Sequence, residues 1–214
     1  MTITTKFCVA GGLGVAIGVG IGGFSLLLEW IQVAEYGTRQ ISELGMLLAI
    51  PLLAAFLAPL PCLVLLFFRK PRLKAGLILL MSTLVLLLAL PIMSFSGRIR
   101  KHAFQRLEAR SAPLVEAIFA YEKDHGKAPE TLADLVPTYM NEIPSTKMRA
   151  YPTYSYASGD TAKKWHDNPW VLYVKTSRGF TNFDMFIYFP KQNYPDTDYG
   201  GSLERIGTWA YVHE

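Results

Sequence analysis

One stretch near the end of the sequence has the spacing of a metal-binding loop. It reads Asp-x-Asp-x-Gly-Gly-x-x-Glu, and its acidic residues are Asp196, Asp198 and Glu204. Alternate carboxylates around a tight glycine turn can direct several oxygen atoms towards a hard cation such as calcium. The stretch matches the front of an EF-hand loop, but Gly207 stands where the closing glutamate would be. Two interpretations follow: a calcium site formed by these three carboxylates, or an ordinary turn, which we favour.

The other residues that could do chemistry lack the arrangement that catalysis needs. The histidines show no metal-ligand spacing and are expected on the surface or at caps: His102, His125, His166 and His213. No serine stands in a G-x-S-x-G elbow. The two cysteines, Cys8 and Cys62, lie in apolar sequence, so a disulfide framework in the polar half is excluded. We therefore expect no catalytic residue, no cofactor and no enzymatic activity.

The elements that would position these residues divide the chain into an apolar half and a polar half. The chain is 51% hydrophobic with a mean hydropathy of +0.24, and three apolar runs at about 7–28, 45–68 and 75–95 account for this. Each run is long enough, at about 1.5 Å per residue, to cross a hydrocarbon core of about 30 Å. No charged residue or histidine lies in the core of a run, which argues against a transporter or pump. We predict a transmembrane region over 1–97 and a water-exposed domain over 98–214.

The first apolar run carries a glycine pattern. Gly14, Gly18 and Gly22 recur every four residues and share one helical face, so a neighbouring helix can approach closely. We expect packing against the other two spans, with homodimerisation as the alternative. A cleaved signal peptide is a competing interpretation of the run, but no clear small-x-small cleavage site precedes polar sequence.

The positive charge sits beside the apolar runs. The formal net charge is +4, and the excess bases are Arg69, Lys70, Arg72 and Lys74, followed by Arg98, Arg100, Lys101, Arg106 and Arg110. Bases in such places most simply contact phospholipid headgroups. No nucleic-acid-binding motif accompanies them, so we expect a lipid bilayer and no nucleic acid as a partner. The positive-inside rule gives close to a tie for the orientation.

A long amphipathic helix is predicted to open the polar half. Apolar residues at helical spacing would form its core face: Phe104, Leu107, Leu114, Val115, Ile118 and Phe119. Pro113 lies within the pattern, so either one helix continues through it or Ser111 caps a second helix. A short helix over Pro129–Val136 and strands over 151–157, 171–176, 184–189 and 208–213 follow. The fold class is therefore α+β, a long helix packed on a small antiparallel sheet. Half of the aromatic residues would form the core, and the other half would face solvent, a partner or headgroups.

The end of this helix carries the phrase Tyr-x-x-Asp-x-Gly-x-x-Pro, at Tyr121, Asp124, Gly126 and Pro129. Further residues continue the phrase: Leu132, Leu135, Ile143, Pro144, Gly200, Gly201 and Trp209. In order and spacing, 98–214 resembles the soluble domain of type II secretion major pseudopilins and related type IV pilin-like proteins. The resemblance implies a pilin-like α+β domain, in a bacterial envelope, on the extracytoplasmic side of the inner membrane. It also makes calcium in the loop of Asp196 more plausible.

The anchor departs from that family. A pilin has a short basic leader, which is cut off before a G-F-[ST]-L-x-x-E start. A single membrane helix follows that start. Here Gly23–Leu26 echoes that start, but Glu29 is one place late and two further apolar runs follow. We expect an integral membrane protein that displays a pilin-like domain to a protein partner or the cell envelope. The alternative is a membrane-anchored sensor or ligand-binding module, with the loops 158–169 and 191–203 as its site.

Overall fold

The computed structural model describes residues 2–38, 41–178 and 182–213. Its contacts divide the chain into two compact units. The first unit comprises Met1–Ile31 and Gln40–Ile99, and the second comprises Gln32–Arg39 and Arg100–Glu214. We refer to them as the apolar unit and the head.

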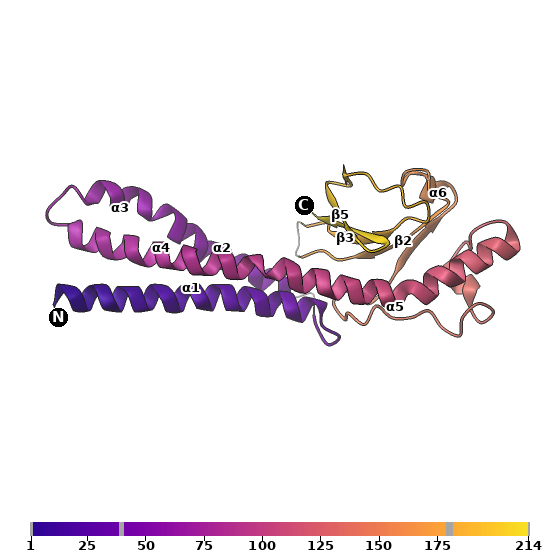
Figure 1. The fold of residues 1–214 in the computed structure, drawn as a ribbon, viewed down its shortest axis with the longest axis horizontal. Helices are drawn as coiled ribbons and strands as arrows, with labels where there is room; N and C mark the ends of the chain where they lie inside the picture. Colours follow the sequence, from indigo (N-terminus) through magenta and orange to yellow (C-terminus); the bar gives the residue numbers. More distant parts are fainter. Residues whose placement is uncertain (1, 39–40, 179–181, 214) are drawn as a thin grey trace. The chain divides into compact units, whose positions relative to one another are not determined.

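The apolar unit is helical. Its elements are α1 (Ile3–Val33), α2 (Ile41–Leu57), α3 (Pro59–Leu65) and α4 (Arg72–Ser94), drawn in indigo to magenta in Figure 1. Three helical stretches of the described residues are long and apolar enough to cross a membrane: Ile3–Val33, Leu47–Leu65 and Arg72–His125. The second stretch is interrupted at Ala58, because Pro59 and Pro61 supply no backbone donors to a continuing helix. The three apolar runs of the sequence are therefore helices, whose ends differ from the predicted ends by a few residues.

The glycine face of α1 packs against α4. A Cβ atom added at Gly14 would lie 3.1 Å from the Met81 backbone, and one added at Gly22 would lie 2.7 Å from Ile92 Cβ. Side chains at these positions would therefore push the helices apart, and α1 and α4 run side by side (Figure 1). The intramolecular packing expected against the other two spans is thus observed with one of them, α4.

The head is one helix on a six-stranded antiparallel sheet. The helix is α5 (Ser96–His125), labelled in Figure 1. The strand order in the sheet is β1-β2-β3-β6-β5-β4. The strands are β1 (Ser155–Ser158), β2 (Trp170–Lys175), β3 (Met185–Tyr188), β4 (Thr197–Asp198), β5 (Gly201–Ile206) and β6 (Trp209–His213). Two short helices complete it: η1, a 3₁₀ turn over Leu132–Leu135, and α6 over Asp160–Lys163.

The predicted apolar face of α5 packs on the sheet. Phe104 stacks on Phe186 with ring centroids 4.7 Å apart, and Phe119 meets Trp170 edge-on at 5.2 Å. Phe119 is the exception in the face, because 41% of it stays exposed. The helix is continuous through Pro113, and the Ser111 hydroxyl donates to the Leu107 carbonyl at 2.6 Å instead of capping a new helix.

The central strands β2, β3 and β6 are buried on both faces, although half of the aromatic residues were expected to face solvent, a partner or headgroups. Opposite α5, a second core contains Ala162, Val171, Ile187, Phe189, Ala210 and Val212. Trp165, Tyr194 and Tyr199 pack against this core. A strand buried on both faces reads as a nearly continuous apolar run, as in Trp170–Lys175.

Several predicted elements differ in extent. The helix expected over Pro129–Val136 is only the 3₁₀ turn η1, and the strand expected from Tyr151 starts at Ser155. The Tyr151 carbonyl instead accepts a hydrogen bond from Thr146 Oγ1 at 2.6 Å. The two segments interpreted as loops also contain structure, namely α6, β4 and the start of β5. Short, polar elements of this kind have too little periodicity to be predicted.

Candidate functional site

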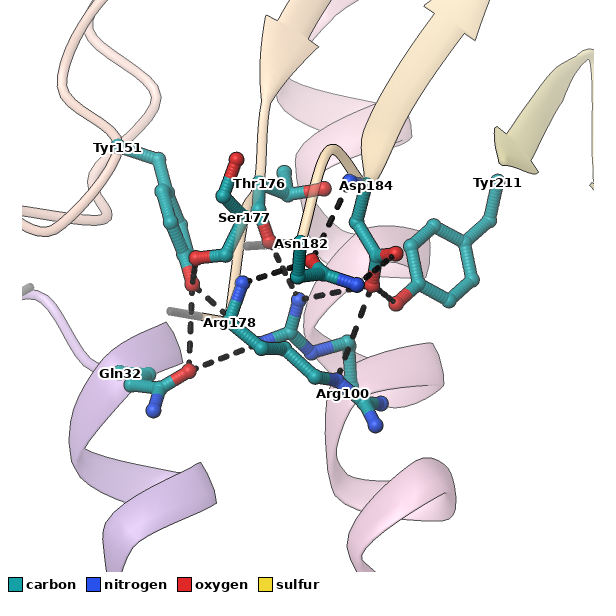
Figure 2. A network of polar contacts seen from close by, with 9 residues as sticks. All are labelled: Gln32, Arg100, Tyr151, Thr176, Ser177, Arg178, Asn182, Asp184 and Tyr211. Carbon is teal, nitrogen blue, oxygen red and sulfur yellow. Dashed lines mark hydrogen bonds and ion pairs between the residues drawn. The ribbon is translucent and has the colours of Figure 1, made fainter. Parts of the chain in front are cut away.

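The most buried charge in the described part of the head is Arg100, near the start of α5. Its side chain is fully buried, although the sequence placed it among bases that contact headgroups. That interpretation was wrong for Arg100. Nη1 donates to the Thr176 carbonyl at 2.7 Å, and Nη2 donates to Gln32 Oε1 at 2.9 Å and to the Tyr151 hydroxyl at 3.2 Å (Figure 2). The guanidinium therefore joins three segments that are far apart in sequence.

A buried carboxylate balances this charge. Asp184 is 2% exposed, and its Oδ2 lies 3.9 Å from Arg100 Nη1 and 3.8 Å from Arg178 Nε. The Tyr211 hydroxyl donates to the same oxygen, and Asn182 Nδ2 donates to Oδ1 at 2.7 Å (Figure 2). A buried ion pair of this kind is retained only where further hydrogen bonds satisfy both partners. The arrangement fixes the ends of β2 and β3 to α5.

Tyr211 acts in this network as a hydrogen-bond donor and not as a base. Burial raises the pKa of the Tyr211 phenol above its usual value. Arg100 and Arg178 lower this pKa, whereas the hydrogen bond to Asp184 raises it. Tyr211 therefore stays neutral at physiological pH, and the network has a positioning role. Sequence gave no signal for it, because Arg100 and Asp184 are far apart along the chain.

The second feature is a surface made by the two loops 158–169 and 191–203. His166 Nε2 lies 2.7 Å from Asp198 Oδ2, and Asn193 Nδ2 donates to the His166 carbonyl at 2.7 Å. Asn168 donates to Asn193 Oδ1 at 2.9 Å and accepts from the Lys191 backbone amide at 3.1 Å. The two loops are thus held together, as the ligand-binding alternative requires.

The predicted calcium residues are engaged separately. Asp198 contacts His166, and its Oδ1 also accepts from the Tyr199 amide at 2.7 Å. Glu204, on β5, pairs with Lys101 of α5. Asp196 is exposed, and its backbone carbonyl accepts from the Leu203 amide at 3.0 Å. Among the residues that the structure describes, no three His, Cys, Asp or Glu side chains are grouped to hold a metal. The calcium site stays a prediction.

Comparison of the chain with protein-family models, curated proteins and solved structures finds no match. The function is therefore inferred from the geometry of the head.

The third feature is a groove between α5 and the sheet, which we call the α5–β6 groove. Its volume is about 340 Å³, and its lining residues are Glu108, Ala109, Ala112, Val115, Glu116, Tyr188, Thr208 and Trp209. Small alanines on the helix leave the space open above Trp209. The lining is mostly apolar, with a carboxylate towards each end of the helical side.

The turn between β5 and β6 fixes one end of the groove. Glu108 Oε1 accepts from the Thr208 amide at 2.7 Å and from its hydroxyl at 2.9 Å. Gly207, with φ +58°, provides the room, because a Cβ atom there would overlap the Glu108 carboxylate. Sequence analysis missed this groove. The alanines at 109 and 112 interrupt the polar face of the helix, but this is a weak signal.

Proposed function

We propose that the chain is a non-enzymatic integral membrane protein of a bacterial inner membrane, which displays a pilin-like head to another protein of the cell envelope. Three helical stretches long and apolar enough to span support the membrane assignment. The resemblance of 98–214 to pilin-like domains supports an extracytoplasmic head. The observation that carries the interaction is the α5–β6 groove, an apolar depression with acidic ends.

The groove defines the chemistry of its partner. Glu108 and Glu116 are eight residues apart on α5, which is about 12 Å of helix at 1.5 Å per residue. Opposite charges across an interface fix register and orientation. The occupant is therefore a partner segment with lysine or arginine at each end of a short apolar stretch. Glu116 is exposed at the rim, whereas Glu108 is already held by Thr208.

Reporter fusions test the membrane arrangement. With the head outside and three spans, a periplasm-active reporter is expected to work at the C-terminus, and a cytoplasm-active reporter is expected to work at Leu73. Alkaline washing of membranes should leave the intact chain in the pellet. Activity of a cytoplasm-only reporter at the C-terminus would overturn the proposed orientation.

Site-specific photocross-linking tests the groove in native membranes. A photoreactive residue at Ala112, in the groove, is expected to give an adduct, whereas one at the exposed Ala133 of η1 is the matched control. Glu116→Lys should abolish the Ala112 adduct, and the adduct peptide should be basic. Exchange of the partner peptide's own bases for acidic residues should restore it. An adduct that persists unchanged with Glu116→Lys contradicts the charge-based contact.

A second candidate is a ligand-binding module, favoured by the hydrogen bonds that join the loops 158–169 and 191–203. Calcium is the first ligand to test. Millimolar calcium should raise the melting temperature of the full-length chain in detergent, and Asp198→Asn should remove this rise. The same shift with magnesium would indicate a non-specific cation effect and would count against a calcium site.

A further inference from the structure

The apolar unit contains a groove between α2 and α4, which we call the α2–α4 groove. Its volume is about 500 Å³, which lies within the range of about 300–1,000 Å³ that is typical of ligand pockets. Its lining consists of Ala49 and six large apolar residues: Ile50, Leu52, Leu53, Phe56, Leu86 and Leu90. None of these described lining residues has a polar side chain. An occupant therefore receives no ion pair or side-chain hydrogen bond from them.

The groove has a packed floor and open rims. Leu52 and Leu86 form the floor, and both pack against a buried cluster contributed by three helices: Ile21, Ala55, Val85 and Ala89. On the α2 rim, Ile50 is 68% exposed and Phe56 is 65% exposed. The packing of three helices keeps the shape of the floor, while the rims leave the groove open to the medium that surrounds the unit.

The lining distinguishes between two kinds of occupant in a bilayer. A transmembrane helix of a partner or of a second copy associates through small residues, which let two backbones approach closely. Ala49 is the single small residue of the described lining, whereas α1 uses three glycines in its contact with α4. A specific protein interface also needs about 20–30 residues a side, which is far more than this lining offers. A hydrocarbon chain meets neither requirement's difficulty, because it is thin, flexible and unbranched.

We propose that the α2–α4 groove holds one acyl chain of a membrane phospholipid. This inference rests on the proposed membrane location and does not involve the head. On α2 the lining runs from Ala49 to Phe56, which is about 10 Å of helix at about 1.5 Å per residue. One leaflet is half of a hydrocarbon core of about 30 Å, so the groove accommodates most of one chain. The bound chain contacts α2 and α4 at once, which lipid elsewhere on a single exposed helix face does not.

Photocross-linking with a labelled lipid tests the proposal on the full-length chain in nanodiscs. The probe is a phosphatidylcholine with a diazirine on one acyl chain, diluted in unlabelled phosphatidylcholine, and adducts are mapped by mass spectrometry. Adducts in 49–56 and 86–90 should be several-fold more frequent than adducts in 60–64. Leu60, Leu63 and Val64 are the matched control, because each is more than half exposed and lies outside the lining. Equal frequencies in the two regions would indicate ordinary lipid contact and would overturn the proposal.

A substitution that fills the groove gives a second readout. Ala49→Phe should reduce the groove adducts several-fold, whereas Ala54→Phe should leave them unchanged. Ala54 is the matched control because it is also an exposed alanine of α2 but does not belong to the lining. Unchanged adducts with a folded Ala49→Phe variant, as judged by its melting temperature, would contradict the assignment. If this variant does not fold, the adduct map of the unsubstituted chain still decides between a groove site and ordinary lipid contact.

Two controls separate this proposal from its alternatives. A photoreactive residue at Leu53 should form a lipid adduct, and a protein adduct in its place would overturn the acyl chain in favour of another helix. Extraction of the chain from membranes by alkaline washing would instead remove the proposed membrane location. Retention in the pellet with equal adduct frequencies would overturn only the groove.

Discussion

The chain packs helices in two opposite ways. In the apolar unit, α1 meets α4 through Gly14, Gly18 and Gly22, where α1 itself contributes no side chain to the contact. In the head, α5 meets its sheet through large rings, with Phe104 stacked on Phe186. The most buried charged group in the described head is an arginine, whereas the glycine contact of the apolar unit involves no charge.

The difference follows from the solvent that each unit meets. In lipid, burying a large apolar side chain gains little, because lipid tails are as apolar as leucine, and close backbone approach supplies the attraction. In water, each buried aromatic ring removes a large apolar area from solvent. The head can then include a buried ion pair, provided that both charges are fully hydrogen-bonded. The two contacts should therefore respond to opposite kinds of substitution.

Removing the buried arginine should have the largest effect. Arg100→Ala leaves Asp184 as a buried charge without the buried cation that balances it, and we expect a loss of about 3–5 kcal/mol in the free energy of unfolding of the head. Arg106→Ala, on the exposed side of the same helix, should cost less than about 0.5 kcal/mol. Urea unfolding in detergent, followed by tryptophan fluorescence, measures both.

A double variant separates charge from packing. Arg100→Met with Asp184→Asn removes both buried charges, so it should be more stable than Arg100→Ala. Equal losses for Arg100→Ala and Arg106→Ala would show that the network contributes nothing to the head.

Substitution in the β5–β6 turn, at one end of the α5–β6 groove, should have the second-largest effect on stability. Gly207→Ala meets two costs, the strain of a positive φ and displacement of the Glu108 carboxylate from Thr208. We expect about 2–4 kcal/mol in total, of which about 1–2 kcal/mol is strain. Gly159→Ala isolates the strain, because Gly159 has the same φ of +58° and nothing within 4 Å of its Cβ position. Equal losses of melting temperature in the two variants would mean that the carboxylate contact contributes nothing.

A large side chain should destabilise the protein more on the glycine face of α1 than at a glycine on another side of the helix. Gly18→Leu places a side chain against the backbone and Cβ atoms of α4, where an added Cβ would already be 3.0 Å from Leu88 Cβ. Overpacking of this kind typically costs about 1–3 kcal/mol. Gly20→Leu is the control, since nothing lies within 4 Å of its Cβ position. The two free energies of unfolding are measured on the purified chain in mixed micelles, by increasing the fraction of a denaturing detergent. A larger loss for Gly20→Leu would place the packing face elsewhere.

Sequence predicted the features that local pattern determines. Apolar runs gave the helices of the apolar unit, the glycine spacing gave the α1–α4 contact, and the stripe from Phe104 to Ile118 gave the packed face of α5. The strand positions of β2, β3 and β6 were close, because β-branched and aromatic residues gather there.

The remaining features depend on contacts between distant residues. Glu108 meets Thr208 only because β6 lies beside α5, and the burial of Arg100 depends on Asp184. No local periodicity records such pairs. A basic residue beside an apolar run usually keeps its charged group in water. The sequence around Arg100 therefore does not distinguish a buried base from an exposed one.

The smallest effect is expected on the exposed surface of the loops 158–169 and 191–203. This surface belongs neither to the glycine contact of α1 with α4 nor to the aromatic contact of α5 with the sheet. The Tyr199 backbone amide, and then His166, lower the pKa of Asp198 below its usual value. A carboxyl group whose folded pKa is lowered stabilises the head above its unfolded pKa of about 3.9, and this contribution is lost as pH falls through the folded pKa. Melting temperatures of the full-length chain and of Asp198→Asn should therefore differ slightly at pH 6 and converge as the pH falls through the lowered pKa of Asp198. A difference that grows towards acid pH would contradict this assignment and would show that protonated Asp198 is the form that the fold favours.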